Sequence, residues 1–195
     1  MAVESSQTIS LNTPIFPFDL PSVDGKNYSV ESFKDADILV IAFSCNHCPY
    51  AKAAWPLLID LYNTFKDKKV SFVAINPNDE VVYPEDDFAT MKIRANEWRI
   101  PFPYLRDESQ EVAKKYDARC TPDIYVYDKG RKLAYRGRIN DNWPRPPELR
   151  SGAAGGQDSS KVTRQDLADA IDALLRGEKP SQPQFPSMGC SIKWK

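Results

Sequence analysis

The chain has 195 residues, 42% of them hydrophobic and 11% aromatic, which is enough to build the core of one domain. Its formal net charge of −1 excludes the strong overall field that draws proteins to nucleic acid or to anionic membranes. No stretch approaches the roughly 20 consecutive apolar residues that span a bilayer, and residues 1–14 lack the apolar segment of a secretory signal. We therefore expect a cytoplasmic protein with no membrane or nucleic-acid partner.

The first half of the chain predicts a hairpin followed by a strand–helix–strand unit. Residues 15–20 and 26–30 flank an Asp-Gly turn, which favours a short N-terminal β-hairpin. The continuous apolar run over 38–43 is typical of a strand buried on both faces. Apolar residues at helical spacing then predict a helix over 49–66, and a second buried strand follows over 70–75.

The second half continues the alternation of helices and strands. A helix is expected over 85–99, and Asp107 is expected to cap a short helix around 112–116. Two strands over 123–127 and 132–139 are separated by an Asp-Lys-Gly turn, so they should form a hairpin.

The C-terminal region predicts a loop, a helix and a tail. Residues 142–162 are rich first in proline and then in small residues, as in a mobile loop. Thr163 is expected to cap the last helix at its N-terminus and Gly177 to end it. We expect one domain with a core over 11–177 and an extended tail over 178–195.

Two cysteines, Cys45 and Cys48, lie where the buried strand gives way to the first long helix. A helix N-terminus presents free N–H groups and partial positive charge, so it should lower the pKa of Cys45. His47, the only histidine of the chain, can stabilise the thiolate further. We expect Cys45 to be the exposed attacking thiol and Cys48 to be the thiol that closes the disulfide.

Other interpretations of these residues remain open. Cys45, Cys48, Cys120 and Cys190 could ligate zinc, but structural zinc sites usually have two close pairs of ligands and this chain has one. His47 could be a passive surface residue. We favour redox chemistry without a metal or other cofactor.

Several motifs together resemble a known family. They are Phe16-Pro-Phe-Asp-Leu-Pro, Cys45-Asn-His-Cys-Pro, Cys120-Thr-Pro-Asp, Tyr135-Arg-Gly-Arg-Ile and the closing Gly189-Cys-Ser-Ile-Lys-Trp. They resemble the thioredoxin superfamily and, within it, the peroxiredoxin-like branch of the AhpC/TSA (redoxin) family. The resemblance implies an α/β, thioredoxin-like fold with a central mixed β-sheet flanked by helices, an N-terminal β-hairpin and an extended C-terminal tail.

The resemblance also implies roles for two residues outside the dithiol. Pro122 should follow a cis peptide bond and lie beside the cysteines, leaving the backbone of Thr121 exposed to pair with an extended substrate. Thioredoxins bury an acid six positions before the first cysteine, where this chain has Leu39. The sequence therefore identifies no proton acceptor for Cys48.

These expectations favour a thiol–disulfide oxidoreductase that reduces disulfides or oxidants and is itself reduced by a thiol electron donor. Because His precedes the second cysteine, as in protein disulfide isomerase, we expect a potential of about −190 to −240 mV. A thiol peroxidase, in which Cys45 forms a sulfenic acid that Cys48 condenses with, is the alternative. A non-catalytic redox sensor or a metal-binding module is the alternative from another class.

The remaining thiols have two interpretations each. Cys120 should lie near the dithiol if Pro122 does, either filling space or forming an alternative disulfide. The tail is long enough to reach the dithiol, so Cys190 could exchange with it. Alternatively, Ile192 and Trp194 merely dock the tail on an apolar groove.

Overall fold

The computed structural model describes residues 2–5, 8–142 and 161–195, and it is built around a five-stranded mixed sheet. The strand order is β6-β5-β4-β8-β9. Strands β4, β5 and β6 run parallel, whereas β8 is antiparallel to both β4 and β9. The strands are β4 (Ile38–Phe43), β5 (Val70–Asn76), β6 (Tyr104–Arg106), β8 (Asp123–Tyr127) and β9 (Leu133–Arg136).

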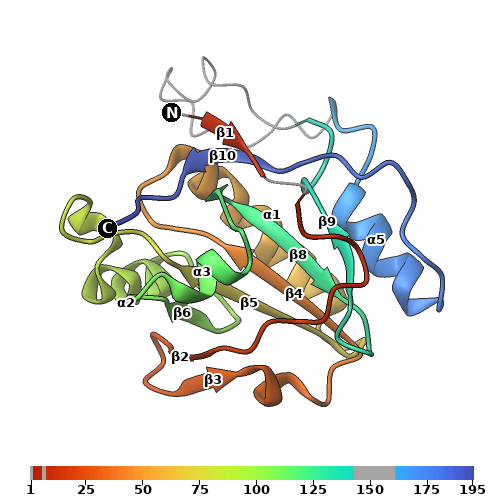
Figure 1. The fold of residues 1–195 in the computed structure, drawn as a ribbon, viewed down its shortest axis with the longest axis horizontal. Helices are drawn as coiled ribbons and strands as arrows, with labels where there is room; N and C mark the ends of the chain where they lie inside the picture. The colour runs from red at the N-terminus through yellow and green to blue at the C-terminus, as the bar shows by residue number, and fades with distance from the viewer. Residues whose placement is uncertain (1, 6–7, 143–160) are drawn as a thin grey trace.

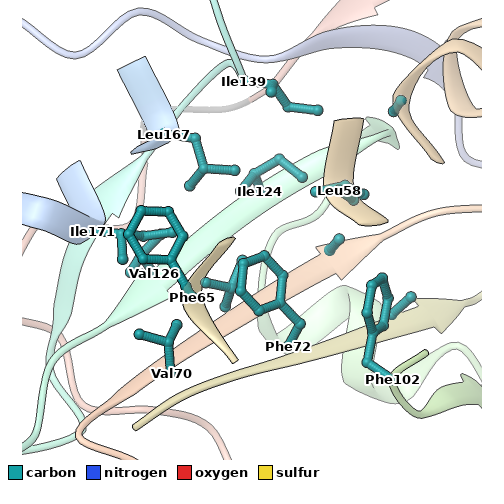
Figure 2. Packing of buried hydrophobic residues seen from close by; sticks show 14 of the residues in the cluster. Leu58, Phe65, Val70, Phe72, Phe102, Ile124, Val126, Ile139, Leu167 and Ile171 are labelled. Atoms are coloured by element: carbon teal, nitrogen blue, oxygen red, sulfur yellow. The ribbon is translucent and has the colours of Figure 1, made fainter. Parts of the chain in front are cut away.

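Alternate side chains of each strand point to opposite faces of the sheet, so apolar residues on both faces need to be covered. One face packs against helices α1 and α5 in a core that includes Leu58, Phe72 and Ile171 (Figure 2). The other face packs against α3 and the N-terminal segment in a second core. The helices are α1 (Pro49–Phe65), α2 (Phe88–Glu97), α3 (Glu111–Lys115) and α5 (Asp166–Leu175), with 3₁₀ turns η1 (Val30–Phe33) and η2 (Pro84–Asp86). None of the helices in the described ranges is both long and apolar enough to cross a membrane.

Two smaller sheets complete the fold. Strands β2 (Asp19–Pro21) and β3 (Asn27–Ser29) form the expected N-terminal hairpin. Strand β10 (Met188–Ser191), from the C-terminal tail, lies between β1 (Ala2–Glu4) and β7 (Cys120–Thr121) and is antiparallel to both. Figure 1 shows β1 and β10 side by side, with β10 passing over the end of the main sheet. The two ends of the chain are thus tied together beside the segment that carries Cys120.

Several local expectations are wrong. Gln165, not Thr163, precedes α5, and Gln110, not Asp107, precedes α3. The Asp107 carboxylate instead accepts from the Ala113 backbone N–H at 2.8 Å, inside that helix. The helix expected over 85–99 begins only at Phe88, because Asp87 caps it by accepting from Thr90 N–H at 2.6 Å. Most of the loop expected over 142–162 lies outside the described residues.

Candidate active site

The dithiol loop connects β4 to α1 as the sequence predicts. Cys48 is the residue immediately before α1, and Pro49 is the first residue of the helix, where its missing N–H costs nothing. Trp55, one and a half turns into α1, donates from its indole N–H to the Cys45 carbonyl at 3.1 Å. The strand, the loop and the helix therefore hold the backbone of both cysteines in place.

Thr121 contacts both sulfur atoms of the pair. Its hydroxyl lies 3.2 Å from Cys45 Sγ, and its carbonyl accepts from the Cys48 thiol at 3.3 Å. The peptide bond between Thr121 and Pro122 is cis, as expected. The structure thus brings Cys45, Cys48, Thr121 and Pro122 together at one end of the sheet.

The expectation that Cys45 is the exposed thiol is wrong. Cys45 and Cys48 are both 0% exposed, and they form a small cluster with Tyr50 and Ala51. Met188 and Cys190 of β10 pack against this cluster. The C-terminal tail therefore covers the dithiol.

The same strand overturns the expected role of the Thr121 backbone. Thr121 is buried, and its backbone is paired in register with Cys190 of β10. An extended substrate cannot pair with this edge while β10 occupies it. The tail thus takes the place that the resemblance gives to a substrate.

The electrostatics of the thiols also reverse the sequence prediction. Burial raises the pKa of Cys45 well above its usual value, and the neighbouring Cys48 adds to the effect. Burial opposes ionisation of Cys48 too, but interactions with the thiols of Cys190 and Cys45 and with nearby backbone N–H groups outweigh it, so the pKa of Cys48 is lowered. The thiols of Cys190 and Cys45 lower this pKa more than the Ala51 N–H in the first turn of α1 does, so the thiol neighbours matter more than the helix end. Cys48 is the thiol most readily ionised.

His47 is fixed by an acid that the sequence did not single out. Its ring Nδ1 pairs with the carboxylate of Asp86, and its ring stacks on Tyr83 with centroids 4.4 Å apart. The His47 side chain is 14% exposed and that of Asp86 is 0% exposed. A stacked, hydrogen-bonded and mostly buried ring is not a passive surface residue.

Asp86 also anchors the dithiol loop itself. One carboxylate oxygen accepts from the Asn46 backbone N–H at 2.7 Å, and the other accepts from the Asn78 amide at 2.8 Å. Burial opposes ionisation of Asp86, but these bonds and His47 outweigh it and lower its pKa. The loop between the cysteines is therefore tied to the η2 turn by a buried, ionised carboxylate.

Three ligand-type atoms of this site lie close enough to share a metal ion. They belong to Cys45, His47 and Asp86 and all fall within 4.8 Å of one another. Both oxygens of Asp86 already accept hydrogen bonds from Asn46, Asn78 and His47, so an ion would have to displace some of them. The set could hold a metal only at the expense of the network that positions the loop.

The two auxiliary thiols have different surroundings. Cys120 is fully buried and its thiol donates to the Pro122 carbonyl at 3.3 Å. It is not part of the cluster around Cys45 and Cys48, in keeping with a space-filling role. Cys190 is partly exposed and packs against that cluster.

Comparison with known proteins identifies a family and supports this fold. The family model of the AhpC/TSA family matches residues 11–136. Peroxiredoxin Q, a chloroplastic protein of Populus jackii, is 27% identical over 99 residues, a match that spans 51% of this chain and less than half, 43%, of that relative.

Two solved structures extend the comparison. An uncharacterised conserved protein from Geobacillus kaustophilus is 45% identical, has a TM-score of 0.88, and matches over 100% of this chain and 97% of its own. The thioredoxin domain of a thiol-disulfide oxidoreductase from Bacteroides vulgatus has a TM-score of 0.57 at 18% identity, covering 74% of this chain and 95% of that domain. The second likeness shows a thioredoxin-like fold.

Proposed function

The chain belongs to the AhpC/TSA family, and on that premise we propose that it is a thiol–disulfide oxidoreductase whose working group is the Cys45–Cys48 dithiol. The observation that carries the proposal is the contact of both sulfur atoms with Thr121, at 3.2 Å and 3.3 Å. Two thiols held on one residue, at the junction of a strand and a helix, can close a disulfide without moving the backbone far.

Cys48 starts the reaction in this proposal, because the thiolate is the nucleophile and Cys48 is the thiol with the lowered pKa. Its sulfur attacks a substrate disulfide, forms a mixed disulfide and releases the first substrate thiolate. Cys45 then gives up its proton and attacks the Cys48 sulfur, which releases the second substrate thiolate. The substrate gains two electrons and two protons, and the protein keeps the Cys45–Cys48 disulfide.

The proton acceptor for Cys45 in this proposal is His47, which Asp86 holds in place. Ligand atoms of Cys45, His47 and Asp86 lie within 4.8 Å of one another, which is within reach of a proton transfer through one bridging group. The buried carboxylate holds the imidazole by Nδ1 and so fixes the orientation of its ring beside Cys45. His47 is thus a proton carrier for the step in which Cys45 closes the disulfide.

A peroxide is the alternative substrate, and the match to peroxiredoxin Q supports this alternative. A peroxide would convert Cys48 to a sulfenic acid and release water or an alcohol, and Cys45 would then condense with it and release water. In either case a thiol electron donor restores the dithiol, which suits a reducing compartment such as the cytoplasm.

Turnover by cysteine variants tests the proposal. Reduction of glutathione disulfide and of hydrogen peroxide is measured for the wild type, Cys45→Ser, Cys48→Ser and the control Cys120→Ser. We expect both dithiol variants to lose activity by on the order of 100-fold or more, while Cys120→Ser stays within about twofold. Wild-type rates in either dithiol variant would contradict the proposal, and the faster substrate decides between the two activities.

A further inference from the structure

We propose that Cys190 is a third redox thiol, which takes over the disulfide from the buried pair as a Cys48–Cys190 bond and presents it to the thiol electron donor. This inference rests on the proposed function of the dithiol. It concerns the return half of the cycle, in which the protein is reduced again. It assigns the C-terminal strand a chemical role in addition to its structural one.

The register of β10 fixes Cys190 beside the dithiol. Cys190 lies opposite Thr121, the residue whose hydroxyl and carbonyl contact Cys45 and Cys48. A Cβ on the preceding residue, Gly189, would lie 2.2 Å from the Thr121 carbonyl oxygen, so glycine is required for this close approach. The three thiols therefore gather around one threonine.

The tail is anchored on the C-terminal side of Cys190 by specific polar contacts. The Lys193 carbonyl accepts from Asp79 N–H at 2.8 Å and from the Gln110 amide at 2.7 Å. The Lys193 N–H donates to Asn78 at 2.9 Å, and Asn78 in turn donates to Asp86. The same network thus positions the loop of the dithiol and the strand of Cys190.

The tail is anchored on the N-terminal side as well. The Ser187 hydroxyl donates to the Gly137 carbonyl at 2.6 Å, and the backbone of Ser187 accepts from Ser5 N–H at 2.8 Å. Ile192, which is 3% exposed, also packs in the second core. Neither the polar anchors nor this apolar docking requires a thiol at position 190.

Exposure gives Cys190 an advantage over the pair in the reaction with a thiol donor. Cys45 and Cys48 are 0% exposed, whereas Cys190 is partly exposed. A thiol donor attacks along the line of the S–S bond and needs access to one sulfur atom. Cys190 offers that access directly, whereas Cys48 and Cys45 become accessible only when the side chains that cover them are displaced.

The oxidation state of Cys48 controls when Cys190 can react. In the reduced protein the interaction with Cys48 is the largest cause of the raised pKa of Cys190, followed by burial. Once Cys48 is in the Cys45–Cys48 disulfide it carries no negative charge, and this restraint on Cys190 is removed. The pKa of Cys190 is therefore lower in the oxidised protein than in the reduced protein, although burial still raises it, and Cys190 ionises more readily after the pair is oxidised.

The exchange balances without an outside oxidant. Cys190 gives its proton to solvent and its thiolate attacks the Cys48 sulfur, so the Cys48–Cys190 bond forms as the Cys45–Cys48 bond breaks. Cys45 leaves as a thiolate and takes up a proton. Two equivalents of a thiol donor then reduce the Cys48–Cys190 bond through a mixed disulfide at Cys190 and leave as a disulfide.

Disulfide mapping of the full-length protein tests the first step. Cys45→Ser is oxidised with one equivalent of diamide, alkylated and digested, beside the control Cys45→Ser/Cys120→Ser. We expect an intramolecular Cys48–Cys190 disulfide in both proteins, detected as one linked peptide pair by mass spectrometry. A Cys190 that remains fully alkylated while Cys48 is oxidised would overturn the proposal.

Re-reduction kinetics test the second step. Cys190→Ser and Cys190→Ala are oxidised to the Cys45–Cys48 disulfide, and their reduction by glutathione is followed with Cys120→Ser as the control. We expect both Cys190 variants to be reduced at least about 10-fold more slowly than wild type and Cys120→Ser at the wild-type rate. Wild-type rates in folded Cys190 variants would overturn the relay, yet leave the proposed function intact if the wild type turns over. Absence of turnover in the wild type would refute the proposed function. The disulfide mapping would still decide whether the Cys48–Cys190 bond forms.

Discussion

Replacement of Asp86 by asparagine should lower the free energy of unfolding substantially, although the two side chains have nearly the same size and shape. The carboxylate is fully buried and accepts from Asn46 N–H at 2.7 Å, from the Asn78 amide at 2.8 Å and from His47. Asparagine can keep one oxygen toward Asn46, but its NH₂ group then faces the NH₂ group of Asn78. Imidazole can accept from that NH₂ group in its other tautomer, so the bond to Asn78 is the one that is certainly lost.

The magnitude follows from these contacts. A hydrogen bond to a charged group contributes about 1.5–3 kcal/mol, and the remaining bonds weaken when the charge is removed. We therefore expect Asp86→Asn to lower the free energy of unfolding by about 2–4 kcal/mol. The assay is urea denaturation of the reduced protein at pH 7, followed by tryptophan fluorescence.

The neighbouring Asp87 provides a matched control. Asp87 caps α2 by accepting from Thr90 N–H at 2.6 Å, and asparagine caps helices about as well as aspartate. Asp87→Asn should therefore change the free energy of unfolding by less than about 0.5 kcal/mol. Equal effects of the two substitutions would refute the argument that Asp86 is a buried anchor.

The pH dependence of the difference gives a second check. The pKa of Asp86 is lowered from 3.8 in the folded protein, so its stabilisation is fully present above that value and is lost as the pH falls through the folded pKa. Down to about pH 5 the wild type should keep this advantage over Asp86→Asn, and it should lose the advantage progressively below about pH 4. An advantage that grows as the pH falls further would contradict this assignment.

Three further predictions concern the tail, the buried ion pair and the potential. Gly189→Ala should displace β10, because the added Cβ would lie 2.2 Å from the Thr121 carbonyl oxygen. The alkylation rate of the dithiol should then rise by about 10-fold or more. An unchanged rate would mean that β10 does not cover the pair. Arg136→Met should leave the Asp123 carboxylate buried without its cation and cost about 3–5 kcal/mol at pH 8 in thermal or urea unfolding. Because burial raises the pKa of Asp123 to about 6 even beside Arg136, its protonation should make that loss smaller at pH 5, and a larger loss at pH 5 would contradict this. Equilibration with glutathione buffers should place the dithiol potential at about −190 to −240 mV, and a value below about −270 mV would contradict the reasoning from His47.

The central strands and the first helix were predictable because their signals are local. The run over 38–43 is apolar at every position, and β4 occupies those residues with all six buried. The helix expected over 49–66 is observed over Pro49–Phe65, since Pro49 fits the first helical position and the apolar stripe continues to Phe65. The cysteines fall at the predicted junction for the same reason.

The chemical surroundings of the dithiol were not predictable, because they depend on contacts between distant parts of the chain. Asp86 lies 39 residues after His47 in a short 3₁₀ turn, within an acidic run that looks like the start of a helix. Its burial depends on how the segment after β5 folds back over the dithiol loop. The only signal in the sequence was the presence of three consecutive acids where one is enough to cap α2.

The prediction that Cys45 is exposed was wrong for a similar reason. A cysteine at a strand–helix junction is open to solvent unless another segment covers it, and the covering strand β10 begins at Met188. Its place depends on pairing with β1 at the other end of the chain and with β7. Such pairings over long sequence separations leave no periodic trace in the sequence.

The position of β10 bears on which substrates the proposed reaction can take. An extended polypeptide that pairs with the Thr121 edge would have to replace a strand that is hydrogen-bonded on both sides, to β1 and to β7. A peroxide or a small disulfide needs only a brief displacement of the Met188 and Cys190 side chains, which cover the pair. Local side-chain motion costs far less than removal of a central strand. The proposed activity should therefore be higher toward small oxidants than toward folded or extended protein substrates. Gly189→Ala should reduce the ratio of these two activities, because it loosens the strand that excludes protein substrates.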